Sequence, residues 1–241
     1  MKHAWIIARK ELQGFFDSLI AYIILVVFLG FSGFFTWLYG SDIFLRNQAD
    51  LQAFFGIAYW TLFFFIPAIT MRSFAEENKT GTIELLLTKP VSDISIVFGK
   101  FLACLLLIVT ALLFTLPYYI TVWNIGPIDH SAVFCGYLGL ILMSSAYISI
   151  GIYMSNITNN QIVAFLSALF VGMLFHILFE VLAGNFTGSV GEMFSYLSLS
   201  THFDSVSRGV IDSRDVIYFL SLILFPLFLT EMNLSKRNLS E

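Results

Sequence analysis

Six apolar stretches, each about as long as a membrane-crossing helix, constrain this chain more than any other feature of its sequence. A helix needs about 20 apolar residues to cross the hydrocarbon core of a membrane. The stretches lack apolar–polar alternation, which favours helices over the strands of a membrane barrel. They are Ser18–Gly40, Phe54–Met71, Phe101–Trp123, Ser131–Met154, Gln161–Ala183 and Val216–Met232. We therefore predict an all-α membrane protein with six transmembrane helices, in which residues 1–241 form a single membrane domain.

The composition agrees with a membrane location. Only 12% of the residues are charged and 58% are hydrophobic, whereas a soluble protein has about 25% charged and 45–50% apolar residues. A chain of 241 residues with so few charges has too little polar surface to cover a soluble fold. The composition argues against a soluble enzyme, a nucleic-acid-binding protein and a disordered protein.

The distribution of Lys and Arg predicts the orientation of the chain. Nine of these residues lie in the N-terminal tail, in the loop after the second stretch and in the C-terminal tail, and three lie in the loops on the opposite side. Cytoplasmic loops of membrane proteins carry the excess of basic residues. We therefore expect both termini in the cytoplasm. An even number of spans agrees with this, because it places both termini on the same side.

The segment before the first stretch is predicted to form a helix. Residues 2–17 combine basic side chains with aromatic and aliphatic ones, and the apolar side chains can share one broad face: Trp5, Ile6, Leu12, Phe15 and Phe16. A basic helix of this kind settles at the level of the lipid headgroups. The alternative is a cytoplasmic extension of the first transmembrane helix.

The loop after the second stretch contains the most charges of any loop. Residues 72–100 hold eight of the chain's charged residues. Gly81 interrupts the segment, Pro90 prevents a helix from continuing, and Ser92 can cap the next helix. Between the two breaks we predict a short amphipathic helix over 82–88, with three side chains on its apolar face: Ile83, Leu86 and Leu87. Such a helix either packs against the base of the bundle or presents a face to a soluble partner.

The loop between the fifth and sixth stretches is unusually apolar for a solvated segment. Residues 184–215 contain recurrent Val, Leu, Met, Phe and Tyr side chains. We expect this loop either to enter the outer half of the membrane or to cap the bundle as short helices.

Most catalytic patterns are absent from the sequence. The Gly99-Lys100 pair does not complete a phosphate-binding loop, because Phe101 follows it instead of Ser or Thr. No two histidines stand at metal-ligand spacing, so we expect no metal site.

One motif resembles an intramembrane serine protease of the rhomboid type: Ser32 lies in a Gly-Phe-Ser-Gly run, and His176 is the candidate base. Small residues in a spanning helix, however, usually serve close helix packing.

His176 and Glu180 are ionisable residues within the fifth stretch. Their spacing of four places them on one face of an α-helix. Ionisable groups at membrane depth suggest a substrate or proton path. The alternative is that both lie near headgroup depth and pair with each other or with water.

The charged loop also carries a resemblance to a known family. Residues 76–92 read EENKTGTIELLLTKPVS and resemble the cytoplasmic segment between the second and third spans of ABC-2-type transporter permeases. The run Ala8–Leu12 is similar to the start of those permeases, and the run from His202 to Asp212 is similar to their outer loop. Within the family, the sequence is most similar to gliding-motility-associated (GldF-type) permease subunits.

The resemblance implies a non-catalytic permease subunit of an ATP-driven transporter in a bacterial inner membrane, with export as the expected direction. Its partners would be an ABC ATP-binding subunit, which binds ATP and Mg, a second copy or a different permease, and an accessory envelope subunit. Residues 2–17 would be the elbow helix. The coupling helix that contacts the ATPase would lie at about residues 80–89, with the coupling residues Glu76, Glu77, Gly81, Thr82, Glu84, Leu85 and Pro90.

A secondary transporter without an ATPase partner is the main alternative. Such a transporter should carry more ionisable groups at mid-membrane depth than His176 and Glu180 provide. The protease alternative predicts that activity depends on Ser32.

Overall fold

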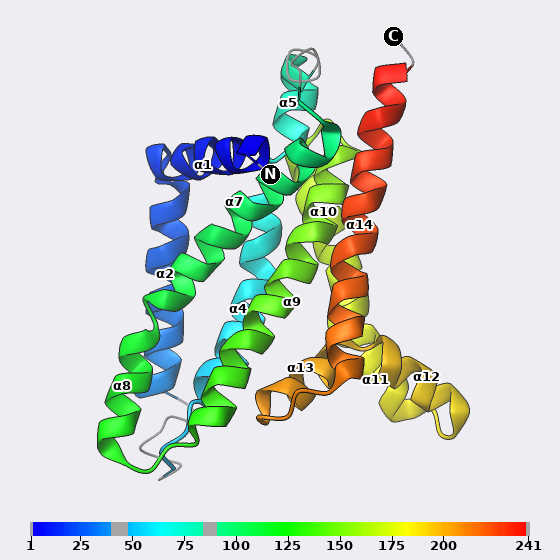
Figure 1. Ribbon diagram of the computed structural model, residues 1–241. Coiled ribbons are helices and arrows are strands. Elements are labelled where there is room, and N and C mark those ends of the chain that lie inside the picture. Colours follow the sequence, from blue (N-terminus) through cyan, green and yellow to red (C-terminus); the bar gives the residue numbers. More distant parts are fainter. Residues whose placement is uncertain (1, 40–47, 84–90, 240–241) are drawn as a thin grey trace.

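The computed structural model describes residues 2–39, 48–83 and 91–239, and the described residues form helices joined by turns (Figure 1). Six helical segments are long and apolar enough to cross a membrane. They are built from α2 (Leu19–Trp37), α4 (Gln52–Thr70), α7 (Asp93–Leu113) with α8 (Leu116–Ile125), α9 (His130–Asn156), α10 (Gln161–Met173) with η1 (Leu174–Leu178) and α11 (Phe179–Asn185), and α14 (Ser213–Leu239). No described residue lies in a β-strand. The predicted all-α membrane fold is confirmed.

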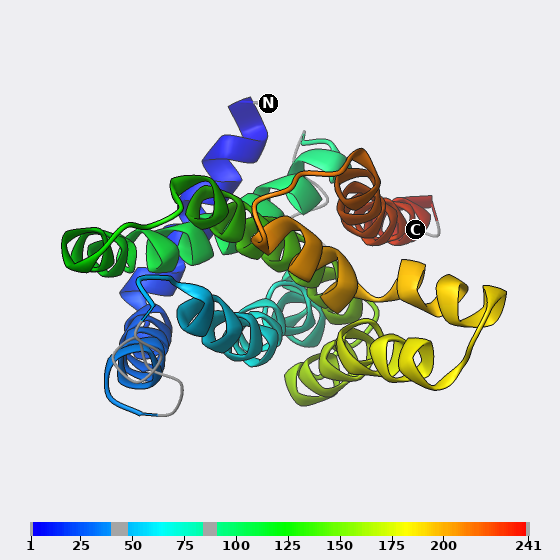
Figure 2. The same ribbon diagram turned by 90° about the horizontal axis from the view of Figure 1, so that it is seen from below.

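Helix α9 lies at the centre of the bundle. It is the most buried of the six segments, and it packs against α4, α7, α10, α13 and α14. Seen from below, α4 and α9 occupy the middle of the molecule, with α2 at one edge and α14 towards the other (Figure 2). Glycine and serine residues along α9 let its neighbours approach closely. At Gly136 the ring of Phe55 fills the space where a side chain would start.

The tightest of these contacts yields a stability prediction. A Cβ atom on Gly151 would overlap the buried side chain of Thr70. We expect Gly151→Leu to lower the free energy of unfolding by about 3 kcal/mol or more, because overpacking a buried helix contact forces backbone shifts. Gly56→Leu on α4 is the matched control, since a Cβ there meets open space. Thermal unfolding of the two variants in detergent should separate them, and equal melting temperatures would contradict the packing.

The first helix, α1 (Lys2–Asp17), lies across the end of α2 and is separate from it (Figure 1). Ser18 lies between the two helices and has an extended backbone (φ −90°, ψ 155°), which interrupts the helical conformation. Helix α1 is therefore not an extension of the first span. Ala4 and Ala8 are buried on the side that packs against α7, where Gly99 allows close approach. Trp5 and Ile6 remain exposed, as expected for side chains that face lipid.

Two short helices lie at the opposite end of the bundle. Helices α12 (Ser189–Leu197) and α13 (Leu199–Ser207) connect α11 to α14 along the chain, which is the second of the two expected forms of this loop (Figure 1). Helix α12 packs beside α11 at the edge of the molecule, whereas α13 packs against α9. Phe203 and Val206 of α13 are buried against the bundle. The described ends of α1, α5 (Ala75–Thr80) and α14 gather at the other end of the molecule (Figure 1). The segments that the distribution of basic residues assigns to one side therefore do lie together.

Candidate functional site

The segment that the sequence singled out begins with the short helix α5. Glu76 and Glu77 lie in its first turn, where carboxylates interact favourably with the helix dipole. The helix ends at Gly81, which has a left-handed backbone (φ 70°), so the predicted break is confirmed. Ser92 occupies the N-cap position of α7, as predicted, but its hydroxyl lies 2.7 Å from the Ser95 hydroxyl and does not cap a backbone N–H. The predicted helix over 82–88 lies largely outside the described residues, and so do three of the expected coupling residues: Glu84, Leu85 and Pro90.

Hydrogen bonds fasten α5 to the end of α9. The Ser155 hydroxyl accepts from the backbone N–H groups of Phe74 and Ala75, both at 3.0 Å, and donates to the carbonyl of Met71 at 3.0 Å. One residue of α5 extends the attachment, because Asn78 donates from Nδ2 to the carbonyls of Asn156 and Thr158 at 3.1 Å each. The start of α5 is therefore held in a fixed position relative to the central helix.

A buried ion cluster ties α5 to two further helices. Lys100 of α7 is only 2% exposed, and its Nζ lies 2.7 Å from Glu77 Oε1 and 3.2 Å from Glu11 Oε1 of α1. The same ammonium group lies 5.0 Å from the centre of the Phe74 ring, a favourable cation–π distance. We call Glu11, Glu77 and Lys100 the Lys100 cluster. A buried charge is stable only with such partners, so the cluster fixes α1, α5 and α7 together.

Beyond this attachment, α5 presents a polar exposed surface. Glu76, Lys79 and Thr80 are exposed, as are Gly81 and Thr82. Ile83, in contrast, is 6% exposed and belongs to the core. Of the apolar face predicted for residues 82–88, this described residue packs against the bundle. The two predicted glutamates are thus in different surroundings: Glu76 is exposed, whereas Glu77 is paired within the bundle.

The fifth span contains one turn of π-helix, η1, and His176 lies in it. Its Nδ1 lies 2.6 Å from the Tyr147 hydroxyl of α9. Its ring is stacked between Tyr59 and Phe63 of α4, with ring centres 4.1 and 4.5 Å away. His176 Nε2 is buried and has no hydrogen-bond partner among the described residues. A π-turn often marks a functional position in a helix, and here it packs an imidazole among aromatic rings.

Glu180 has a different partner from His176. It accepts a hydrogen bond from Ser200 of α13 at 2.7 Å, so the two residues do not pair with each other, which was one of the alternatives for this pair. The π-turn changes the helical register between them, because its hydrogen bonds run from i to i+5. The pKa of Asp204, which lies nearby, is raised. Partial burial and the Glu180 charge both raise this pKa, and they outweigh the opposing effect of Arg208.

The protease pair is not assembled. Ser32 donates a hydrogen bond to the carbonyl of Leu29 in its own helix, at 3.3 Å. His176 uses its Nδ1 for Tyr147 instead. The described geometry therefore contains no Ser32–His176 hydrogen bond, which a nucleophile and its base require. Within the described residues there is also no group of three or more His, Cys, Asp or Glu side chains that could hold a metal ion.

Sequence reasoning missed the partners that hold α5 in place. Lys100 appears in the sequence as the last basic residue of a loop, although α7 already begins at Asp93. Its position directly before a long apolar run was the available signal, because a cation inside a spanning helix needs a buried partner. Ser155 and Glu11 carry no comparable signal in the sequence.

A family model described as ABC-2 family transporter protein matches residues 5–230 of this chain. The chain belongs to the ABC-2 transporter family. The match covers nearly the whole length, from the first turn of α1 to the last third of α14, and includes every residue of the Lys100 cluster. This ABC-2 protein is therefore a multi-pass membrane transport protein, and its family associates with ABC ATP-binding subunits. Comparison with curated proteins gives no match.

Proposed function

We propose that this ABC-2 protein is the non-catalytic permease subunit of an ATP-driven exporter in a bacterial inner membrane, with both termini in the cytoplasm. The observation that carries the proposal is the attachment of α5 to three other helices, α1, α7 and α9, in a chain that matches the ABC-2 family over residues 5–230. A segment that receives force from a partner must be joined to the helices that it moves. ATP and Mg bind on the partner subunit.

The docking surface for the ATPase is the exposed part of this segment. Glu76 offers a carboxylate in the first turn of α5, and Gly81 and Thr82 follow at the exposed end of the helix. We assign basic residues of the ATPase as the partners of Glu76, and we extend the surface through Glu84, Leu85 and Pro90 on the family resemblance. Glu77 belongs to the internal Lys100 cluster instead.

Force on α5 reaches the bundle by three routes. The chain itself continues into α4, Ser155 and Asn78 connect to α9, and Lys100 connects to α7 and α1. Closure of an ATPase dimer would shift these helices together, which is the rigid-element motion typical of alternating access. Twelve spans from two permease subunits complete the transporter. We assign it to a gliding-motility system with an accessory envelope subunit, on the resemblance to GldF-type permeases.

A secondary transporter is less well supported. In such proteins several ionisable groups at mid-membrane depth couple ion and substrate movement. His176 is enclosed by aromatic rings and Glu180 is hydrogen-bonded to Ser200, which leaves neither side chain in an evident ion path.

Co-purification tests the proposal. The protein carrying a tag is isolated from its native membrane in mild detergent, and the bound proteins and the ATPase activity are measured. We expect a soluble nucleotide-binding subunit in the wild-type preparation and a loss of most of it in Glu76→Lys, because the reversed charge repels the basic groups on the partner. Glu192→Lys is the matched control, since Glu192 is an exposed carboxylate on α12 at the opposite end of the molecule. A preparation without any ATPase would favour the secondary transporter.

A further inference from the structure

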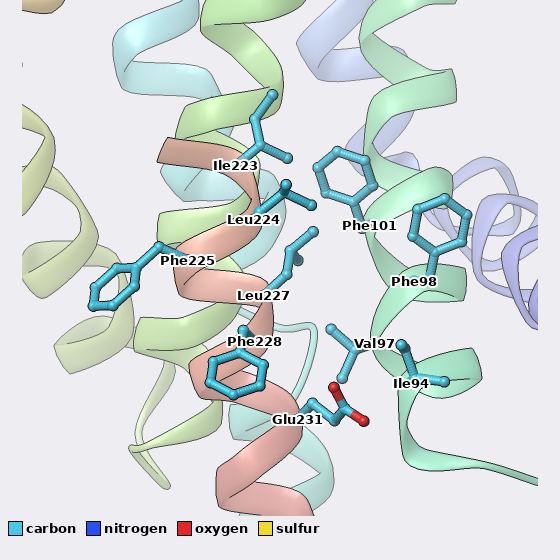
Figure 3. A pocket seen from close by; sticks show the side chains of 10 residues that line it. All are labelled: Ile94, Val97, Phe98, Phe101, Ile223, Leu224, Phe225, Leu227, Phe228 and Glu231. Atoms are coloured by element: carbon cyan, nitrogen blue, oxygen red, sulfur yellow. The ribbon is translucent and has the colours of Figure 1, made fainter. Parts of the chain in front are cut away.

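An apolar groove runs between α7 and α14 on the outside of the bundle (Figure 3). It has a volume of about 530 Å³, which is within the range of pockets for small ligands. Its lining residues are Ile94, Val97, Phe98, Phe101, Ile223, Leu224, Phe225, Leu227, Phe228 and Glu231. Glu231 is the single polar residue among them.

The groove has an apolar end and an acidic end. Its lining runs from Ile94 to Phe101 on α7 and from Ile223 to Glu231 on α14, which corresponds to about 10–12 Å along each helix axis. Figure 3 shows the Glu231 carboxylate directed towards α7, beside Ile94 and Val97. Ile94 lies in the first turn of α7, so the carboxylate lies at the end of the bundle that carries α1 and α5 (Figure 1). The apolar end points towards the membrane interior.

The Glu231 carboxylate has no partner within the described part of the chain. No described side chain forms an ion pair or a hydrogen bond with it. Lys236, on the same helix, lies beyond the groove and does not line it. Glu231 is partly buried, and a carboxylate beside apolar side chains gains from a cation or a hydrogen-bond donor. The ligand that fits this groove therefore has an apolar chain and a positively charged group with N–H donors.

We propose that the groove binds a phospholipid with a primary amine in its headgroup, with an acyl chain between α7 and α14 and the ammonium group donating to Glu231. An anionic headgroup would be repelled by Glu231, and a choline headgroup has no N–H to donate. A second copy of the chain fits less well, because a two-fold contact centred on the groove would bring two Glu231 carboxylates together. This inference does not depend on the ATPase partner proposed above.

Native mass spectrometry of the delipidated full chain provides the test. Phosphatidylethanolamine, phosphatidylglycerol and phosphatidylcholine are added separately at equal concentration, and the bound lipid per protomer is counted. We expect phosphatidylethanolamine to bind on the order of tenfold more tightly than phosphatidylglycerol. The ammonium group of the first lipid donates a charge-assisted hydrogen bond to Glu231, whereas the anionic headgroup of the second is repelled by it. Glu231→Gln should remove this preference, whereas Glu192→Gln, at an exposed carboxylate on α12, should keep it.

A second pair of variants tests the groove itself. Leu224→Trp places a bulky ring in the groove and should lower the binding of phosphatidylethanolamine several-fold, whereas Leu220→Trp, at an exposed leucine on the same helix outside the groove, should leave it unchanged. Equal binding of the three lipids, or an unchanged preference in Glu231→Gln, would overturn the proposal. A disulfide-linked dimer formed by Phe228→Cys would also overturn it, because the groove would then be an interface between copies. The native Cys104 and Cys135 are buried and should not react.

Discussion

Replacing Lys100 with Met is expected to lower the free energy of unfolding by about 3 kcal/mol. The substitution removes the ammonium group that lies between Glu11 and Glu77 and leaves two partly buried carboxylates facing each other. Removal of one partner from a buried ion pair typically costs about 3–5 kcal/mol, and we expect the lower end because both carboxylates are about a quarter exposed. Thermal or denaturant unfolding in detergent measures the change.

Two controls separate the charge effect from a packing effect. Lys79→Met removes an exposed lysine of α5 and should change stability by less than about 0.5 kcal/mol. The double variant Lys100→Met/Glu77→Gln should recover part of the loss, because the remaining repulsion is then reduced. A single Lys100→Met variant as stable as the wild type would mean that the cluster does not hold α1, α5 and α7 together.

The second large effect is expected at His176. His176→Ala removes a ring from between Tyr59 and Phe63 and leaves the buried Tyr147 hydroxyl without its partner. Truncation of a buried ring typically costs about 3–5 kcal/mol. His176→Phe retains a ring in the stack and loses only the hydrogen bond, so its cost should be about 1–3 kcal/mol. The two unfolding free energies, measured under the same conditions, give the comparison.

The His176→Phe variant also distinguishes packing from proton handling. The double variant His176→Phe/Tyr147→Phe removes both hydrogen-bonding groups and should regain stability relative to His176→Phe, because no buried polar group is then left unpaired. We expect both variants to transport substrate at close to the wild-type rate. Loss of transport in a well-folded His176→Phe protein would instead assign His176 to the substrate or proton path.

Glu77 illustrates how a correct local prediction can leave a residue's surroundings open. The sequence indicates the charged loop and a break at Gly81, and the structure confirms the break. The sequence predicts its short helix after Gly81, over 82–88, whereas α5 (Ala75–Thr80) lies before that glycine. Neighbouring glutamates nevertheless differ, since Glu76 is exposed and Glu77 contacts Lys100. Helical geometry turns consecutive side chains about 100° apart, and the sequence alone does not say which of the two faces the bundle.

From the sequence alone, it stayed open whether the N-terminal helix is separate from the first span and whether the outer loop is helical. The six spans and the breaks at Gly81 and Ser92, in contrast, could be predicted. Each depends on local physics: the apolar length that a membrane requires, and the backbone preferences of glycine and of helix-capping residues. Which buried polar groups meet depends instead on how the helices pack. Lys100 lies 23 residues from Glu77 and 89 from Glu11, and Tyr147 lies 29 from His176. Such pairs form because helices distant in the chain pack side by side and bury groups that then require a partner.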